Sequence, residues 1–286
     1  MIIRLITALL LCTTQAEVLD APLRRWMLSL DQPMRRGNGL LAVAPDRLVA
    51  TTATGQLHVI DTQTGSILDT LDDADSELEC TSSAVALDDD VVVYSVFSPA
   101  AQESQVVAYN WRLSVVEWQV TIPGEAVGTP LVGENAVYVV HTVSFRGRVS
   151  VLVDGTIAAF FPSVDRIDPL GPGTVRTVRG RDVVVVAENR RNGFSSQGNL
   201  YMLVQDEDGA LEFEWELASS FPRSAVAAPA VSADATAVFL GQQGSLVTGW
   251  VGRNDLSDVL RGTANDINPR WGRGLTPNDS SEDARK

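Results

Sequence analysis

A chain of 286 residues with 45% hydrophobic side chains can bury a substantial core, which excludes disorder over most of its length. It contains two cysteines and two histidines, so a disulfide-stapled scaffold is excluded and almost no room is left for a His/Cys zinc cluster. Acidic residues outnumber basic residues 36 to 22, and the net charge of −14 leaves no basic footprint for nucleic acid or anionic lipid.

Residues 1–16 are predicted to be a signal peptide. Arg4 precedes an apolar run from Leu5 to Leu11, and cleavage is expected after Ala16. The run is too short to span a bilayer of roughly 30 Å. A buried N-terminal element is one alternative, and a bacterial lipoprotein signal ending at Cys12 is another. We expect a secreted protein or one in the secretory-pathway lumen, which would be the periplasm in a bacterium, with no transmembrane segment.

Loss of the signal peptide leaves Cys80 as the only thiol, so no internal disulfide can form. Free cysteine is among the most buried residue types, and Cys80 is predicted to be buried as a small apolar side chain. An intermolecular disulfide is the alternative.

Past residue 40, short β-rich runs alternate with turn residues, and long helical periodicity is missing. Five valine-rich runs each follow a turn residue, namely Asp46, Asp89, Glu134, Arg181 and Asp234. These turn residues lie 43, 45, 47 and 53 residues apart. A period of about 40 to 50 residues with several strands per unit is typical of a β-propeller. We predict an all-β propeller of about five four-stranded blades over residues 17–252, followed by a mobile polar tail, 253–286.

Each unit repeats one order of strands. A first run carries a small residue and a proline, as in Gly128–Val132 and Ala227–Val231, and the valine-rich run follows. The third strand begins with glycine, as in Gly55–Ile60, and the fourth ends near an aromatic residue, as at Trp118 and Trp215. Strands this short cannot bury their faces alone and must stack on neighbouring units.

The stretch from Thr54 to Leu68, TGQLHVIDTQTGSIL, resembles the repeat of pyrroloquinoline-quinone-type (PQQ-type, quinoprotein-like) β-propellers. Their pattern is a strand, Asp, a turn, Thr-Gly, a second strand and a tryptophan. Asp61 and Thr64–Gly65 are predicted to form the hairpin, because Asp bonds back to the backbone and Gly accepts a left-handed conformation. The closing tryptophan falls at Asp69, at Trp118, near Ala159–Phe160, and at Phe213 with Trp215 close by. Since aromatic rings fill the wedge between blades, the missing ring at Asp69 predicts a weaker first blade.

The count of five units does not decide whether the ring is closed. The segment Trp26–Leu30 lies ahead of unit one and could supply the outer strand of unit five, which would close the ring. The alternative is an incomplete ring, an open arc whose exposed edges a partner covers.

The resemblance implies a PQQ-dependent oxidoreductase, which brings an adjacent cysteine pair, a calcium site and a catalytic aspartate. This chain has no such cysteine pair, so we carry over no catalytic residue and predict neither a cofactor nor a metal site. His58 and His141 stand alone on predicted strands, and each is expected to be a packed or surface side chain and not a general base. The run Asp206–Gly209 lacks the spacing of a calcium loop and is predicted to be an acidic hairpin.

Acidic residues gather between units one and two. The cluster contains Asp69, Asp72, Asp73, Asp75, Glu77 and Glu79, and Asp88–Asp90 follow soon after. Such charges repel one another and stay solvated, so we expect soluble loops. A surface for a basic partner or for a weakly bound divalent cation is the alternative.

The sequence therefore predicts a non-enzymatic scaffold that binds a protein partner, since rigid blades hold loops for recognition. A degenerate PQQ-dependent oxidoreductase is one alternative. Another is a propeller subunit of a membrane-protein assembly or insertion complex. The outer-membrane-protein assembly lipoprotein of bacteria and the large luminal subunit of the endoplasmic-reticulum insertion complex have similar propellers. The oligomeric state does not follow from the sequence.

Overall fold

The computed structural model describes residues 27–30, 34, 39–72, 78–161, 170–178, 180–187, 190–192, 195–197, 200–205, 211–217, 228–231, 237–242 and 246–251. The predicted signal peptide, the acidic hairpin Asp206–Gly209 and the tail 253–286 lie outside these residues. All regular elements described are β-strands, and no helix that could cross a membrane occurs among them.

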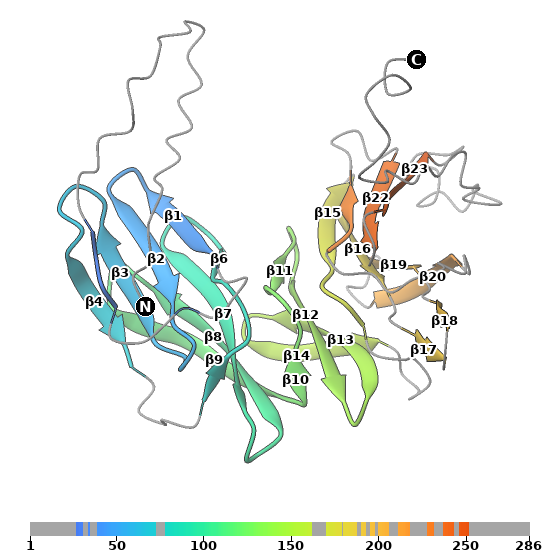
Figure 1. Cartoon of the computed structure of the whole chain (residues 1–286), viewed down its shortest axis with the longest axis horizontal. Helices are drawn as coiled ribbons and strands as arrows, with labels where there is room; N and C mark the ends of the chain where they lie inside the picture. Colours follow the sequence, from blue (N-terminus) through green and yellow to red (C-terminus); the bar gives the residue numbers. More distant parts are fainter. Residues whose placement is uncertain are drawn as a thin grey trace, which may run out of the picture.

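Five antiparallel sheets follow one another along the chain, and each forms one blade (Figure 1). The first blade contains β1 (Leu40–Ala44), β2 (Arg47–Thr51), β3 (Leu57–Asp61) and β4 (Ile67–Leu71). The second contains β5 (Glu79–Cys80), β6 (Val85–Ala86), β7 (Val91–Ser98), β8 (Glu103–Asn110) and β9 (Val115–Pro123). The third contains β10 (Glu125–Ala126), β11 (Leu131–Val132), β12 (Val137–Val143), β13 (Arg146–Val153) and β14 (Thr156–Phe161).

The fourth blade contains β15 (Thr174–Val178), β16 (Arg181–Ala187), β19 (Leu200–Gln205) and β20 (Leu211–Leu217). A separate hairpin, β17 (Arg190–Asn192) and β18 (Ser195–Gln197), lies between β16 and β19 in the chain. The fifth blade contains β21 (Ala230–Val231), β22 (Ala237–Gln242) and β23 (Leu246–Val251). Four strands per blade are therefore confirmed for blades one and four. In blades two and three the inner strand is split into two short pieces, and blade five has three described strands.

The valine-rich runs form the second strand of each blade, and in β7, β12 and β16 both faces are buried. In β7, Val91 and Val93 pack with the third blade, whereas Val92 and Tyr94 pack with the first. A strand that is buried on both faces reads as a continuous apolar run rather than as an alternating one. Three such apolar clusters join blades one and two, two and three, and three and four.

A β-bulge recurs in the pairing of the two outer strands of each four-stranded unit. The register shifts after Val59, Ala108, Val151 and Met202, and the residues paired to these four are Asp69, Trp118, Ala159 and Trp215, respectively. The bulge therefore marks the position of the closing tryptophan in every one of the four blades. In blade four this position belongs to Trp215, and Phe213 pairs just beyond the bulge.

The described blades form an open arc. The inner strands touch in chain order, β1 with β6, β6 with β11, β11 with β15, and β15 with β21. Figure 1 shows the first and fifth blades at the two ends of this arc. Of the segment predicted to complete the fifth blade, Trp26 lies outside the described residues, and Met27–Leu30 belong to no strand. Figure 1 draws Met27–Leu30 at the first-blade end, so this segment does not supply the outer strand of the fifth blade there.

Candidate binding surface and blade contacts

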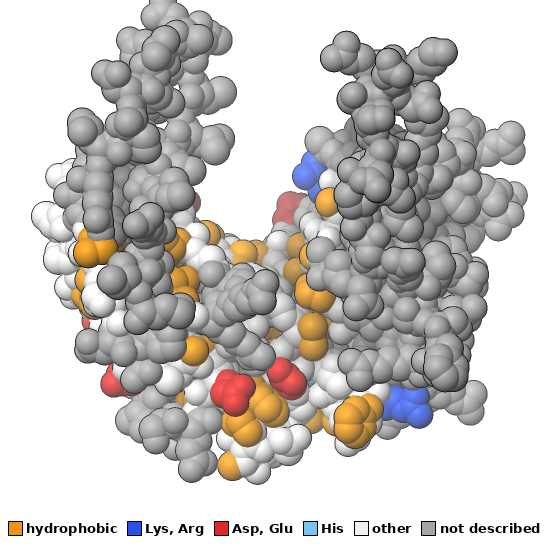
Figure 2. Space-filling view, viewed as in Figure 1, with side chains coloured by type: hydrophobic (Ala, Val, Ile, Leu, Met, Phe, Trp, Pro, Cys, Tyr) orange, Lys and Arg blue, Asp and Glu red, His pale blue; other side chains and the backbone are white. Residues whose placement is uncertain are grey.

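The inner strands line the concave side of the arc. Three of these strands carry an exposed alanine, namely Ala42 on β1, Ala86 on β6 and Ala230 on β21, and Arg176 is exposed on β15. Figure 2 shows a hollow between the two arms, and hydrophobic side chains of described residues lie on its floor. A concave surface of this kind admits the backbone of a partner segment closely, because alanine side chains project little. It is the candidate binding surface of the described structure.

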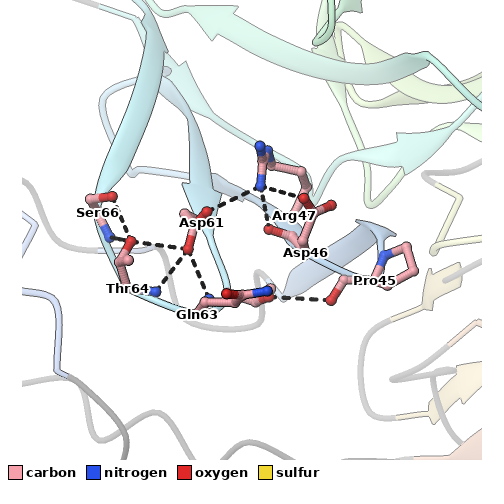
Figure 3. A network of polar contacts seen from close by, with 8 residues as sticks. Pro45, Asp46, Arg47, Asp61, Gln63, Thr64 and Ser66 are labelled. Atoms are coloured by element: carbon pink, nitrogen blue, oxygen red, sulfur yellow. Dashed lines mark hydrogen bonds and ion pairs between the residues drawn. The ribbon is translucent and has the colours of Figure 1, made fainter.

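The polar groups of the first blade close its outer hairpin. Asp61 Oδ1 accepts hydrogen bonds from the main-chain nitrogens of Gln63 and Thr64, at 2.9 and 2.7 Å, and from the Thr64 hydroxyl at 3.0 Å (Figure 3). Arg47 lies 3.1 Å from the other oxygen of Asp61 and 2.8 Å from Asp46. The hydrogen bonds from Thr64 lower the pKa of Asp61, and Gly65 has a φ of 73°. The predicted Asp and Thr-Gly hairpin is confirmed, and the hydrogen bonds of these residues hold its turn.

The closing position of the first blade makes a polar contact with the second. Asp69 accepts a hydrogen bond from the hydroxyl group of Tyr109. The bond from Tyr109 holds the pKa of Asp69 below its usual value. Burial and the same bond raise the pKa of Tyr109 to about 12, so at neutral pH the phenol keeps its proton and donates it to a carboxylate.

The closing position of the second blade makes the predicted aromatic contact. Trp118 packs against the apolar cluster that blades two and three share, and it lies over the turn at Gly155 of the third blade. A Cβ added to Gly155 would lie 2.6 Å from the Cβ of Trp118. The ring therefore fills the wedge between the blades, and the glycine makes room for it. In the third blade, Phe161 provides an aromatic contact, with its ring centroid 6.1 Å from that of Tyr201 in blade four.

A buried carboxylate joins blades three and four. Asp182 on β16 accepts hydrogen bonds from the main-chain nitrogens of Glu134 and Asn135, at 3.0 and 3.1 Å. It also accepts from the hydroxyls of Tyr138 and Thr177, at 3.0 and 2.7 Å. All four donors are protein groups, so this charge is fully engaged in holding a turn of the third blade. Sequence reasoning did not identify it. The available signal was an acid at the start of a valine run, where a buried strand excludes unpaired charge.

Both histidines are buried and make hydrogen bonds. His141 Nδ1 lies 2.8 Å from the carbonyl of Pro123, which can only accept, and Nε2 lies 2.9 Å from the hydroxyl of Ser150. Burial lowers the pKa of His141 to about 4, so the ring is neutral at physiological pH and links the second blade to the third. His58 Nδ1 lies 2.9 Å from the hydroxyl of Thr70 within the first blade.

Cys80 is buried in the apolar cluster between blades one and two, as predicted, and its thiol donates to the carbonyl of Ser82 at 3.0 Å. A thiol in this position is inaccessible to a second molecule while the blades stay together. The intermolecular disulfide is therefore not the role that the folded structure gives it.

Three described acidic residues of the predicted clusters, Asp72, Asp88 and Asp90, have separate local partners. Asp72 accepts from the Gln56 amide at 3.2 Å, and Asp90 pairs with Arg112. Asp88 accepts from the main-chain nitrogens of Asp90 and Val91, both at 2.8 Å, which closes the turn before β7. Asp73, Asp75 and Glu77 lie outside the described residues. No group of three or more potential metal ligands occurs within the described ranges.

Among the residues that the structure describes, Cys80 and Asp182 do not fit the PQQ site that the resemblance implies. That site needs an accessible cysteine pair and a carboxylate with free ligand positions. Cys80 is buried in a core, and the four donors around Asp182 occupy its carboxylate. We therefore derive no chemical step through this cofactor.

The repeated sheets, the bulges at the closing positions and the contacts between consecutive blades define the fold of this chain as a β-propeller. No family model matches the sequence, and no curated protein matches it. Among solved structures, the chain is similar to BamB from Moraxella catarrhalis, with a TM-score of 0.57 and 14% sequence identity. The match covers 79% of this chain and 63% of that one, so the chain spans less than two thirds of the length of that structure. At this identity the similarity shows the fold.

Proposed function

We propose that this propeller is a non-enzymatic scaffold that binds a segment of a protein partner on its concave surface. The observation that carries the proposal is the open arc: Figure 2 shows a hollow between its two arms, and three of the inner strands carry an exposed alanine. The reactive groups that the sequence singled out support it, because His141 and Asp61 are occupied in structural contacts and Cys80 is buried. In this proposal the rigid blades form the concave binding surface, and a segment of the partner protein binds to it.

The similarity to BamB favours one form of this proposal, a propeller subunit of a membrane-protein assembly complex. In that form the partner would be a membrane protein or a companion subunit, and the location would be the periplasm or another extracytoplasmic compartment. The expected signal peptide agrees with this location.

Site-specific photocrosslinking tests the proposal. A photoreactive residue at Ala86, on the concave side, should crosslink one defined partner in the native host, whereas the same residue at Gln119, exposed on outer strand β9, should not. Identification of a membrane protein or of an assembly subunit would support the more specific form. Equal crosslinking from both positions, or from neither, would contradict a concave binding surface.

A second experiment addresses the oxidoreductase alternative. The mature protein is incubated with pyrroloquinoline quinone and calcium, and its spectrum and its oxidation of alcohols and sugars are measured. The scaffold proposal predicts no stoichiometric cofactor spectrum and no oxidation. A bound cofactor with substrate turnover would overturn it.

A further inference from the structure

The turn between β12 and β13 holds an aromatic side chain in a conformation that few residues adopt. Val143 pairs with Arg146, so Ser144 and Phe145 alone join the two strands, and their φ angles are 47° and 66°. Two-residue hairpin turns with a positive φ at both positions favour Asn-Gly and similar pairs, because a bulky side chain crowds the backbone in this region. Phenylalanine is therefore a poor residue for the turn itself.

Phe145 also contributes little to the core. It is 84% exposed, which is the highest exposure of any large hydrophobic side chain in the part of the chain that the structure describes. Single exposed apolar residues are common on protein surfaces, but packing does not explain one that also strains its own turn. Backbone strain of this kind gathers at functional sites. A contact with another molecule would explain both the exposure and the conformation.

Two arginines and a second phenylalanine continue the surface that begins at this turn. Arg146 and Arg148 lie two positions apart on β13, so their side chains leave the same face of the sheet. Phe160 on β14 pairs with Ser150, which places it on that face too, and it is 52% exposed. The guanidinium carbon of Arg148 lies 5.7 Å from the centroid of the Phe160 ring. Together with Phe145 these side chains form an aromatic and arginine stripe, roughly 15 Å long at the rise of a β-strand.

The stripe is a basic region of an acidic protein. Residues 135–153 contain two arginines and no acidic residue, although the whole chain has a net charge of −14. The acid of the adjoining strand β10, Glu125, pairs with Thr142, so its side chain leaves the opposite face of the sheet from Arg146 and Arg148. Carboxylate groups of a partner are therefore attracted to the stripe and repelled by the acidic surface elsewhere.

We propose that Phe145, Arg146, Arg148 and Phe160 bind an acidic segment of a protein partner, with an apolar side chain of that segment packed against Phe145. Aromatic rings and arginines are enriched at the centres of protein interfaces, and guanidinium groups match the geometry of carboxylates. This surface is distinct from the concave one, because Figure 1 shows the tip of the β12–β13 hairpin on the side of the arc that faces away from the hollow. Figure 2 shows hydrophobic and arginine side chains around the place of this tip.

Fluorescence anisotropy of labelled peptides mixed with the mature protein tests the stripe. The probe is a peptide in which glutamates alternate with leucines, and the comparison peptide carries glutamine in place of every glutamate. The acidic peptide should bind at least about tenfold more tightly, with an affinity that falls as salt is added, because the arginines attract its carboxylates. Equal binding of the two peptides, or no binding of the acidic one, would overturn the proposal.

Three variants locate the binding. Phe145→Gly should weaken binding of the acidic peptide about tenfold, although its turn accommodates glycine better and the variant should be the more stable protein. Arg146→Gln should reduce the preference for the acidic peptide over the glutamine peptide. Leu113→Ala is the matched control, since Leu113 is 69% exposed on a turn of blade two, and it should leave the affinity unchanged. Equal losses in Phe145→Gly and Leu113→Ala would contradict the stripe, whereas crosslinking from Ala86 reports on the concave surface separately.

Discussion

Replacement of the buried carboxylate at Asp182 is expected to weaken the contact between blades three and four. Each carboxylate oxygen accepts from one main-chain nitrogen and one hydroxyl, Glu134 with Thr177 and Asn135 with Tyr138. In Asp182→Asn, an amide nitrogen takes the place of one oxygen. The hydroxyl at that site can rotate to accept, but the main-chain nitrogen cannot, so one buried N–H loses its acceptor. The remaining bonds also lose their charge.

The loss amounts to about 2 to 4 kcal/mol, since an unsatisfied buried donor costs about 1 to 3 kcal/mol and charge-assisted bonds exceed neutral ones by about 1 kcal/mol. Urea unfolding followed by tryptophan fluorescence should show a midpoint lowered by about 1 M. Asp61→Asn is the control, because its carboxylate closes an exposed turn, and a smaller shift is expected. The reasoning is refuted if the two variants have the same midpoint or if Asp182→Asn is as stable as the wild type.

Three further predictions concern stability. His141 is neutral in the fold with a pKa of about 4 against 6.5 when unfolded, so the unfolded chain binds the proton first as the pH falls. Stability should decline between pH 6.5 and about 4, by on the order of 3 kcal/mol, and His141→Gln should remove this dependence in urea titrations at each pH. Gly155→Ala should lower the free energy of unfolding by about 1 to 3 kcal/mol, because the added Cβ meets Trp118. Gly180→Ala is the control, since nothing lies within 4 Å of an added Cβ there, and it should cost about 1 kcal/mol. Thermal unfolding measures both, and equal losses would contradict the close contact at Gly155. Phe145 is 84% exposed at a φ of 66°, so Phe145→Gly should raise stability by about 0.5 to 1 kcal/mol, and a loss would contradict the assigned turn.

The repeat made most of the fold predictable. The spacing of the valine runs located the second strand of every blade, and the Asp and Thr-Gly pattern located the hairpin at Asp61. The pattern also indicated the closing position at Asp69 and Trp118, because the third and fourth strands keep a fixed register with a bulge. The local sequence pattern is enough to predict these features, because the same strand order and turn recur in every unit.

Contacts between blades were not predictable in the same way. The partners of Asp182 lie 44 to 48 residues away in the chain, apart from Thr177, and no local pattern pairs them. The hydrogen bond between Tyr109 and Asp69 joins residues 40 positions apart in the chain, so the missing ring alone predicted a weaker blade and not a polar contact. Likewise, the conformation of Phe145 follows from the tight β12–β13 turn, for which its residue type gives no signal.

The central claim is that five blades follow one another in an arc whose ends do not meet, and the distance between its terminal inner strands tests this most directly. Spin labels at cysteines introduced at Ala42 on β1 and Ala230 on β21 report that distance by pulsed electron paramagnetic resonance, and the buried Cys80 stays unlabelled. A pair at Ala42 and Ala86 serves as the reference, because β1 and β6 are in contact. The account predicts a distance between Ala42 and Ala230 well beyond that of the reference pair. Equal distances for the two pairs would show a closed ring and contradict the open arc.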